Sequence, residues 1–127
     1  MPGILVISKG TELLRVPTEN LVYIKADGNY CHVHTRFGKE QMVSFQLGQI
    51  EDMIEDQLGK DGINFIRLGR GLIVNTDFVY FIDITRQCLV LSDCVSCFFD
   101  GEDLKASRDV LIKLKAYIDA TLNNNGI

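Results

Sequence analysis

The sequence feature that most constrains the fold is a series of short β-forming runs separated by turn residues. About ten such runs, rich in β-branched and aromatic residues, follow one another along the chain. Glycine, asparagine and aspartate between them favour hairpins, because these residues tolerate the positive φ angles of tight turns. Short strands joined by hairpins indicate a mainly β fold with mostly antiparallel pairing rather than βαβ units. The predicted strands are residues 4–8, 12–16, 21–25, 30–36, 40–45, 63–68, 72–75, 78–84, 88–92 and 95–99.

Two segments have helical rather than strand periodicity. Near residues 47–57, apolar residues recur at helical spacing with Glu and Asp on the other side, which predicts an amphipathic helix that covers a sheet. The glycines within residues 59–62 are expected to end this helix. A second helix is predicted near residues 107–120, with Ser107 as its N-cap and Arg108 at its start.

Length and composition suit one folded domain. At 127 residues with 46% hydrophobic content, the chain can bury a core without disulfide or metal support. No apolar run is long enough to cross a bilayer, and no basic region precedes the first apolar stretch as it would in a secretory signal. We therefore expect a single domain over residues 1–127, cytoplasmic and without a membrane partner.

The four cysteines raise the alternative of a metal site. Cys94 and Cys97 have the spacing of zinc ligands, and His32 and His34 lie elsewhere in the chain. Both of these cysteines fall in strand-like sequence, however, where residues three apart point to opposite faces. No second pair of cysteines has this spacing. We therefore predict no metal and no other cofactor, with buried free thiols as the expected state.

Residues 65–75, Phe-Ile-Arg-Leu-Gly-Arg-Gly-Leu-Ile-Val-Asn, place Arg67 and Arg70 around two glycines directly before a β-branched run. Glycine lets a backbone approach a ligand closely, and a guanidinium binds phosphate or the O6/N7 edge of guanine with two hydrogen bonds. The pattern is typical of a turn that meets a phosphate chain or nucleic acid. The alternative is a hairpin corner with two solvated arginines, and this stretch alone does not decide between them.

Three motifs, in order and with matching spacing, resemble those of the LytTR DNA-binding domain family. Residues 21–30, Leu-Val-Tyr-Ile-Lys-Ala-Asp-Gly-Asn-Tyr, resemble the family's strand and turn ending in Asn-Tyr. Residues 65–75 resemble its central signature, Phe-x-Arg-Ile-His-Arg-Ser followed by a short apolar run and Val-Asn. Residues 106–108, Ala-Ser-Arg, resemble its closing Ser-Arg motif before a Lys-rich helix. The matched region covers about residues 16–118.

The resemblance implies an elongated β-β-β fold and a stand-alone transcriptional regulator that binds a specific sequence of duplex DNA. Loops of family members enter neighbouring major grooves from one side of the duplex and bend it. Gly69 and Gly71 stand where the family often has His and Ser, so one side-chain contact to DNA is missing here. Carried over to this sequence, the expected DNA-binding residues are Asn29, Tyr30, Arg67, Arg70, Lys105, Arg108 and Lys115.

These residues are expected to divide between reading bases and holding phosphates, and only base contacts carry sequence information. The expected base readers are Arg70 and Arg108, with Asn29 or Tyr30. The expected phosphate contacts are Arg67, Lys105 and Lys115. Three alternatives remain open: Arg67 as an inward-facing structural arginine, Asn29 as a residue that satisfies only its own turn, and Arg108 as an exposed arginine without a role.

The net charge of −4 and the pI near 5.1 count against a nucleic-acid binder at first sight. The acid is concentrated within residues 51–56, whereas most of the candidate cations lie in the later half of the chain. A local basic face is sufficient to meet phosphates, so the distribution of charge matters more than its sum.

The expected partner is therefore double-stranded DNA, and a dimer on repeated sites remains open. The alternative function is a protein-interaction or sensor module that has kept the fold and lost DNA binding. We do not predict an enzyme or a small-molecule substrate, because no nucleophile, base and orienting group occur together and no phosphate-binding glycine motif follows a βα unit.

Overall fold

The computed structural model describes residues 3–92, 97–99 and 108–124. These residues form two compact units, Met1–Asp77 and Phe78–Ile127, which we call the N-terminal and C-terminal units. Every strand pair in the described part is antiparallel, and two α-helices accompany the strands, so the predicted mainly β fold is confirmed. Within the same ranges, no helix has both the length and the apolar character that a membrane crossing needs.

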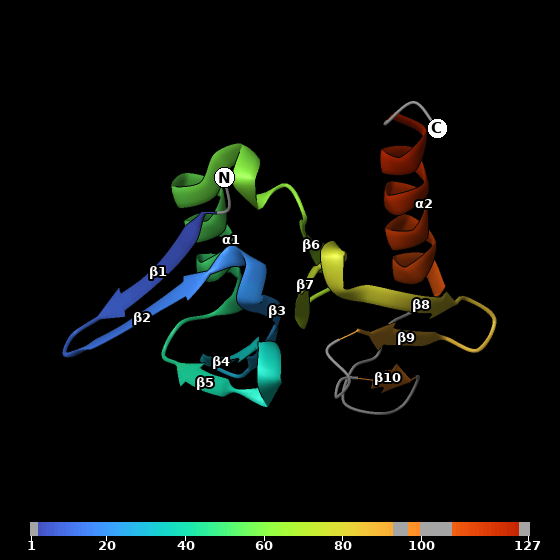
Figure 1. Cartoon of the computed structure of the whole chain (residues 1–127). Coiled ribbons are helices and arrows are strands. Elements are labelled where there is room, and N and C mark those ends of the chain that lie inside the picture. Colours follow the sequence, from blue (N-terminus) through green and yellow to red (C-terminus); the bar gives the residue numbers. More distant parts are fainter. Residues whose placement is uncertain (1–2, 93–96, 100–107, 125–127) are drawn as a thin grey trace. The chain divides into compact units, whose positions relative to one another are not determined.

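The N-terminal unit contains a hairpin and a five-stranded sheet (Figure 1). The hairpin pairs β1 (Ile4–Lys9) with β2 (Glu12–Pro17). The sheet has the strand order β5-β4-β3-β7-β6. Its strands are β3 (Leu21–Asp27), β4 (Tyr30–Thr35), β5 (Glu40–Val43), β6 (Phe65–Leu68) and β7 (Leu72–Asn75). Short 3₁₀ turns are formed by Thr18–Asn20, Arg36–Gly38, Gly59–Gly62 and Thr76–Phe78.

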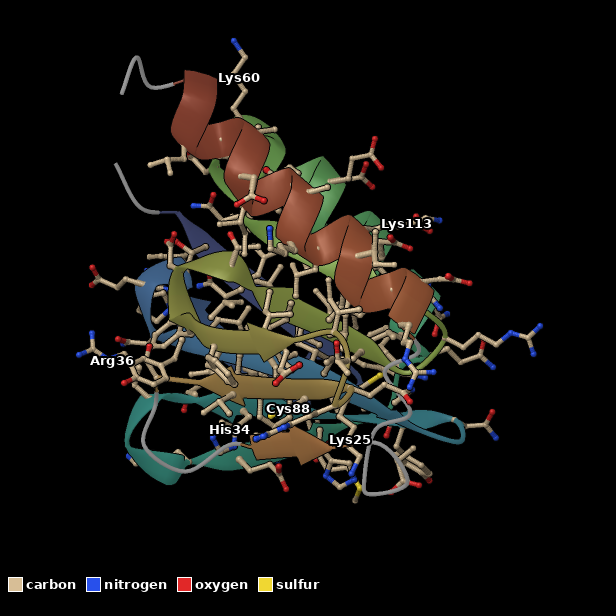
Figure 2. The ribbon with its side chains drawn as sticks, turned by 90° about the vertical axis from the view of Figure 1, so that its right-hand side faces the viewer. Lys25, His34, Arg36, Lys60, Cys88 and Lys113 are labelled. Carbon is tan, nitrogen blue, oxygen red and sulfur yellow. The ribbon has the colours of Figure 1, made fainter. Side chains whose placement is uncertain are left out.

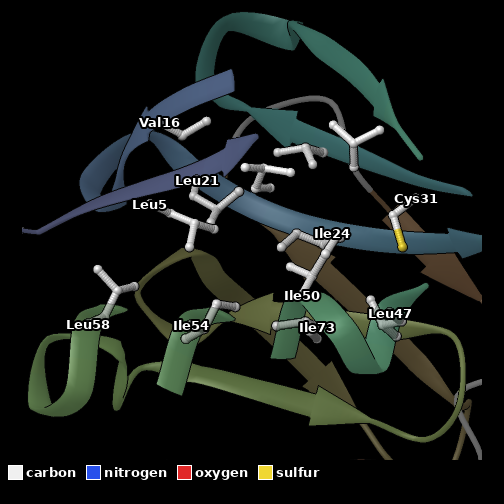
Figure 3. Close-up of a cluster of buried hydrophobic side chains, with 13 residues drawn as sticks. Leu5, Val16, Leu21, Ile24, Cys31, Leu47, Ile50, Ile54, Leu58 and Ile73 are labelled. Atoms are coloured by element: carbon white, nitrogen blue, oxygen red, sulfur yellow. The ribbon is translucent and has the colours of Figure 1, made fainter. Parts of the chain in front are cut away.

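Helix α1 (Leu47–Leu58) packs its apolar side against the five-stranded sheet and the hairpin, which confirms the predicted amphipathic helix. Gln46 precedes the first turn of the helix: the Gln49 side chain accepts a hydrogen bond from the Gln46 N–H at 2.8 Å, and the Gln49 N–H donates to the Gln46 carbonyl oxygen at 3.0 Å. Figure 3 shows the buried side chains of the helix facing those of the strands. The core consists of Leu5, Ile7, Val16, Leu21, Ile24, Cys31, Val33, Val43, Leu47, Ile50, Ile54, Leu58 and Ile73.

The side chain of Gln57 joins α1 to the edge of β1. Its Nε2 donates to the Val6 carbonyl oxygen at 2.8 Å, and its Oε1 accepts from the Val6 N–H at 2.9 Å. One amide thus makes the two hydrogen bonds that a neighbouring strand would make. Gln57 therefore covers an otherwise open strand edge and fixes the hairpin against the helix.

Replacing Gln57 with alanine is expected to lower the free energy of unfolding by about 1–2 kcal/mol, because both Val6 backbone groups lose their partner. Urea denaturation followed by circular dichroism measures this change. The matched control is Glu55→Ala, which removes an exposed side chain of the same helix that bonds to no other described residue. Equal losses for the two variants would show that the Val6 contact does not stabilise the hairpin.

The C-terminal unit contains a three-stranded sheet in the order β10-β9-β8 and one helix. Helix α2 contacts β8, and Leu111 and Leu114 on this helix are fully buried. Their spacing is the helical period that the sequence indicated for its apolar stripe. The elements are β8 (Val79–Asp83), β9 (Cys88–Leu91), β10 (Cys97–Phe99) and α2 (Arg108–Asn124).

The differences from the sequence prediction lie at the ends of elements. Helix α2 continues past residue 120 to Asn124, because no helix-breaking glycine occurs before Gly126. Strand β5 ends at Val43 instead of residue 45, because the Ser44 carbonyl oxygen bonds to Lys9 Nζ at 2.9 Å and the chain then turns into α1. Strand β6 begins after residue 63, since the 3₁₀ turn before it continues into Ile63, whose N–H donates to the Lys60 carbonyl.

Candidate nucleic-acid interface

Two hairpin tips lie side by side at one end of the five-stranded sheet. Strand β3 pairs with both β4 and β7, so the β3–β4 turn is next to the β6–β7 turn. The Ala26 N–H donates to the Gly71 carbonyl oxygen at 2.8 Å and ties the two turns together. We call residues 26–30 and 69–71 the paired tips. The sheet thereby brings together three predicted DNA-binding residues that are distant in sequence, Asn29, Tyr30 and Arg70.

Arg70 is at the centre of the β6–β7 tip and is exposed. The preceding residue, Gly69, has a φ of 64°, a left-handed conformation that glycine adopts without strain. No hydrogen bond or ion pair joins Arg70 to another described residue. No described residue therefore occupies the donors of its guanidinium.

Asn29 and Tyr30 form the end of the β3–β4 tip, after Gly28 with a φ of 62°. Tyr30 is 46% exposed, and Asn29 is exposed. The Oδ1 of Asn29 accepts a hydrogen bond from Gln46 Nε2 at 3.3 Å, which links the tip to the start of α1. Asn29 thus bonds to a neighbouring element rather than to its own turn. Its Nδ2 donates to no acceptor among the described residues.

Arg67 lies on β6, and its side chain bonds both to α1 and to Gly69 at the start of the β6–β7 tip. Its Nη1 bonds to Glu51 Oε1 at 2.9 Å, its Nε donates to the Gly69 carbonyl at 3.1 Å, and its side chain is 29% exposed. Arg67 and Arg70 are three positions apart, and residues an odd number apart point to opposite faces of a strand, so the sequence already indicated different directions for the two side chains. This geometry favours the structural alternative for Arg67, in which it joins the acidic helix to the β6–β7 turn.

The other predicted contacts lie in the C-terminal unit. Arg108 is the first residue of α2, is exposed, and donates from Nη2 to the Thr85 carbonyl oxygen at 3.4 Å. Lys115, farther along α2, pairs with Asp119 through an Nζ to Oδ2 distance of 2.7 Å. A bond to phosphate would have to compete with this ion pair. Lys105 lies outside the described residues, as does the predicted cap Ser107.

A polar cluster lies on the sheet face opposite the one that α1 covers. His32 Nε2 is 2.9 Å from Asp27 Oδ2, and its Nδ1 is 3.4 Å from Glu40 Oε2. His34 is buried and stacks on Tyr23, with ring centroids 4.6 Å apart (His34 is labelled in Figure 2). In the described ranges, no group of His, Cys, Asp and Glu residues has the arrangement of a metal site. Both histidines make contacts to side chains on neighbouring strands of this sheet.

The cysteine side chains described in the structure are buried. Cys31 lies in the core, and burial raises the pKa of its thiol to about 11, an effect that the Arg67 guanidinium partly offsets. At neutral pH this thiol stays protonated and is a poor nucleophile and a poor metal ligand. Cys88 is also buried. The Cys94 of the alternative zinc motif, and the side chain of Cys97, lie outside the described residues.

Asn75 is a structural residue of the central motif that the sequence analysis did not assign. Its side chain is 2% exposed, and its Nδ2 donates to the Leu21 carbonyl at 2.9 Å and the Thr18 carbonyl at 3.4 Å. Its Oδ1 accepts from the Asp77 N–H at 3.0 Å. The amide thereby ties the ends of β7 and β3 to the turn before β3. The available signal was a polar residue that ends an apolar strand.

Comparison with known proteins identifies the family of the chain and a solved structure with a similar fold. A sequence profile of the LytTr DNA-binding domain matches residues 11–119, slightly more than the region covered by the motifs. A solved structure similar to the chain is the LytTr DNA-binding domain of a protein described as a methyl-accepting/DNA response regulator from Bacillus cereus. The two share 19% sequence identity and superpose with a TM-score of 0.62 over 91% of this chain and 96% of that chain, which speaks to the fold alone. No curated protein sequence matches the chain significantly.

Proposed function

The chain belongs to the LytTR family of DNA-binding domains, and on this premise we propose that it binds a specific sequence of duplex DNA as a transcriptional regulator. The observation that carries the proposal is the pair of adjacent hairpin tips, which presents Arg70, without a partner among the described residues, beside Asn29 and Tyr30. A guanidinium matches the O6 and N7 atoms of guanine, and an asparagine amide matches adenine. Hairpin tips are also narrow enough for a major groove about 12 Å wide.

Arg70 and Arg108 are the proposed readers of base edges, assisted by Asn29 or Tyr30. Arg70 is supported by its exposure and by the absence of any partner for it among the described residues. Arg108 is supported by its place at the start of α2, where the helix dipole favours an anion nearby. Its contact with the Thr85 carbonyl is long, at 3.4 Å, so the guanidinium can leave it at low cost.

Phosphate contacts are assigned to Lys105 and Lys115, which would supply affinity without sequence information. Arg67 is a weaker candidate for phosphate because its guanidinium is held by Glu51. We extend the proposal to residues 1–127 as one DNA-binding domain that acts without a catalytic step. A dimer on repeated sites is compatible with it.

The experiment that tests the proposal is selection of bound fragments from genomic DNA, followed by sequencing. An enriched common motif is expected, since bidentate base contacts discriminate between sequences by about 1–3 kcal/mol each. Fragments without a shared motif would instead indicate a module that binds phosphates alone. No bound fragments would favour the alternative of a protein-interaction module with this fold.

The affinity for the selected site is expected to fall steeply with salt. If roughly four to six cations meet phosphates, the slope of log K against log salt should be about −4 to −5. Fluorescence anisotropy of a labelled duplex measures it. Lys115→Ala should make the slope shallower by about one, whereas Asp119→Asn, which frees Lys115 from its ion pair, should not. A slope near zero for the native chain would rule out a phosphate-dominated interface.

A further inference from the structure

Strands β2 and β5 of the N-terminal unit border a common cleft. The two strands belong to different sheets and are not hydrogen-bonded to each other, and Figure 1 shows them on the same side of the unit. Two adjoining hollows of about 250 Å³ and 570 Å³ lie between them. Both hollows are lined by Leu14 of β2 and Gln41 of β5. The cleft is therefore continuous along the two strand edges.

The cleft side of β2 carries open backbone groups. Both backbone groups of Val6 bond to Gln57, so the Val6–Arg15 pair is not hydrogen-bonded within the hairpin. The Thr18 N–H donates to the Gly3 carbonyl at 2.9 Å. Counting from this bonded pair, hydrogen-bonded and non-hydrogen-bonded pairs alternate so that Val6–Arg15 is again a non-hydrogen-bonded pair. It follows that the N–H and C=O groups of Leu13 and Arg15 point away from β1. No other described residue bonds to them.

The facing edge of β5 is already partly closed. The Thr35 N–H donates to the Lys39 carbonyl at 2.7 Å, which fixes which residues of β5 are hydrogen-bonded to β4. Every second residue of β5, including Met42, therefore directs its backbone groups away from β4. The Met42 carbonyl accepts from Gln41 Nε2 at 3.1 Å, and the Ser44 carbonyl accepts from Lys9 Nζ at 2.9 Å. Strand β5 thus forms a wall of the cleft, and β2 provides the edge that can accept a new strand.

The side chains of the larger hollow define which peptide fits it. Leu14, Val16 and Val33 give it an apolar lining. The charged ends of Arg15 and Lys39 border it and bond to no other described residue. Arg36, which Figure 2 labels, adds a third cation to the lining, against the single carboxylate of Glu40. In a strand next to β2, alternate side chains would face the apolar lining and the cations.

We propose that this cleft binds an extended segment of a partner protein, in which apolar residues alternate with acidic ones, as an added strand on β2. The interaction goes beyond DNA binding and does not depend on the paired tips. A duplex fits poorly here, because its outer surface cannot pair with a strand edge or fill an apolar cleft. Backbone pairing supplies affinity in such complexes, and the alternate side chains supply specificity.

The direct test uses a short synthetic peptide in which valine alternates with glutamate and aspartate. Titration into the isotope-labelled full chain, followed by NMR, is expected to shift the amide signals of β2 and β5. Hydrogen exchange of the Leu13 and Arg15 amides should slow in the complex, because these N–H groups become bonded. A peptide with lysine at every acidic position should bind at least about fivefold more weakly. Each exposed charge pair contributes little alone, so the difference comes from several pairs together. Equal binding of both peptides, or no slowing at Leu13 and Arg15, would overturn the proposal.

Variants separate backbone pairing from charge. Leu13→Pro removes an outward N–H that β1 does not use and should abolish peptide binding, whereas Leu13→Ala should retain most of it. If Leu13→Pro does not fold, Lys39→Glu remains decisive, because this exposed change should weaken the acidic peptide and strengthen the lysine peptide. All folded variants should keep native affinity for duplex DNA. Competition between DNA and peptide for the Leu13 and Arg15 amides would assign the cleft to nucleic acid instead.

Discussion

Replacing Asn75 with alanine is expected to lower the free energy of unfolding by about 2–4 kcal/mol, the largest stability effect predicted here. The change removes the donor to the Leu21 and Thr18 carbonyls and the acceptor for the Asp77 N–H. The side chain is 2% exposed, so water cannot easily replace these hydrogen bonds. Urea denaturation monitored by circular dichroism measures the loss.

Two further variants show whether hydrogen bonding is the cause. Asn75→Asp keeps an acceptor for the Asp77 N–H. It replaces the amide that donates to two carbonyl oxygens by a carboxylate oxygen, which those carbonyls repel. This variant should therefore destabilise the chain at least as much at neutral pH. Asn64→Ala removes one longer bond, 3.3 Å to Asp77 Oδ2, and should cost about 0.5 kcal/mol. A loss below about 1 kcal/mol for Asn75→Ala would mean that the buried amide is not important for stability.

The fold class was predictable because the strand pattern is local. Ile24 on β3 and Val33 on β4 are cross-strand partners, and both side chains lie in the core. The turn between the two strands contains a glycine at positive φ. Hairpin pairing joins neighbours in sequence, so turn residues and alternation determine most of the register. The helix at 47–57 was predictable for the same reason, since its apolar period is contained within it.

The contacts that position the site were not predictable from local patterns. Gln57 and Val6 are far apart in sequence, and nothing around either residue indicates that one amide replaces a neighbouring strand. The bond between Asn29 and Gln46 depends in the same way on where α1 begins relative to the β3–β4 tip.

Arg67 illustrates the limit for charged residues. An arginine beside a glycine-rich turn suits phosphate binding, and only the position of α1 places Glu51 at 2.9 Å from its guanidinium. The alternation of side chains along a strand already indicated a structural role for Arg67 as an alternative to phosphate binding. A choice between these two roles requires the tertiary packing. Arg70 differs because its place at a turn already predicted exposure, and the structure puts it beside a second tip.

The largest effect on binding is expected for Arg70, which we propose as a base reader. Its donors are unpaired in the described structure, and the β3–β4 tip stands next to it. A guanidinium that forms two hydrogen bonds to guanine discriminates against the wrong base, whereas one that meets a phosphate binds every sequence alike. The identity of the DNA sequence is therefore the variable that separates these roles.

Arg70→Ala should weaken binding to the selected duplex by about 1–3 kcal/mol, roughly 5- to 150-fold, and relax the preference at one base pair. Arg108→Ala should act similarly at a different base pair. Arg70→Lys is the matched control, because it keeps the charge but loses the planar fork, so it should retain binding to a scrambled duplex and still lose preference for the selected one. Anisotropy titrations of each variant with both duplexes measure these effects, and unfolding curves should stay unchanged because the side chain is exposed. If Arg70→Ala weakens both duplexes equally and Arg70→Lys restores both, Arg70 holds a phosphate, and specificity must come from Asn29, Tyr30 or the shape of the DNA.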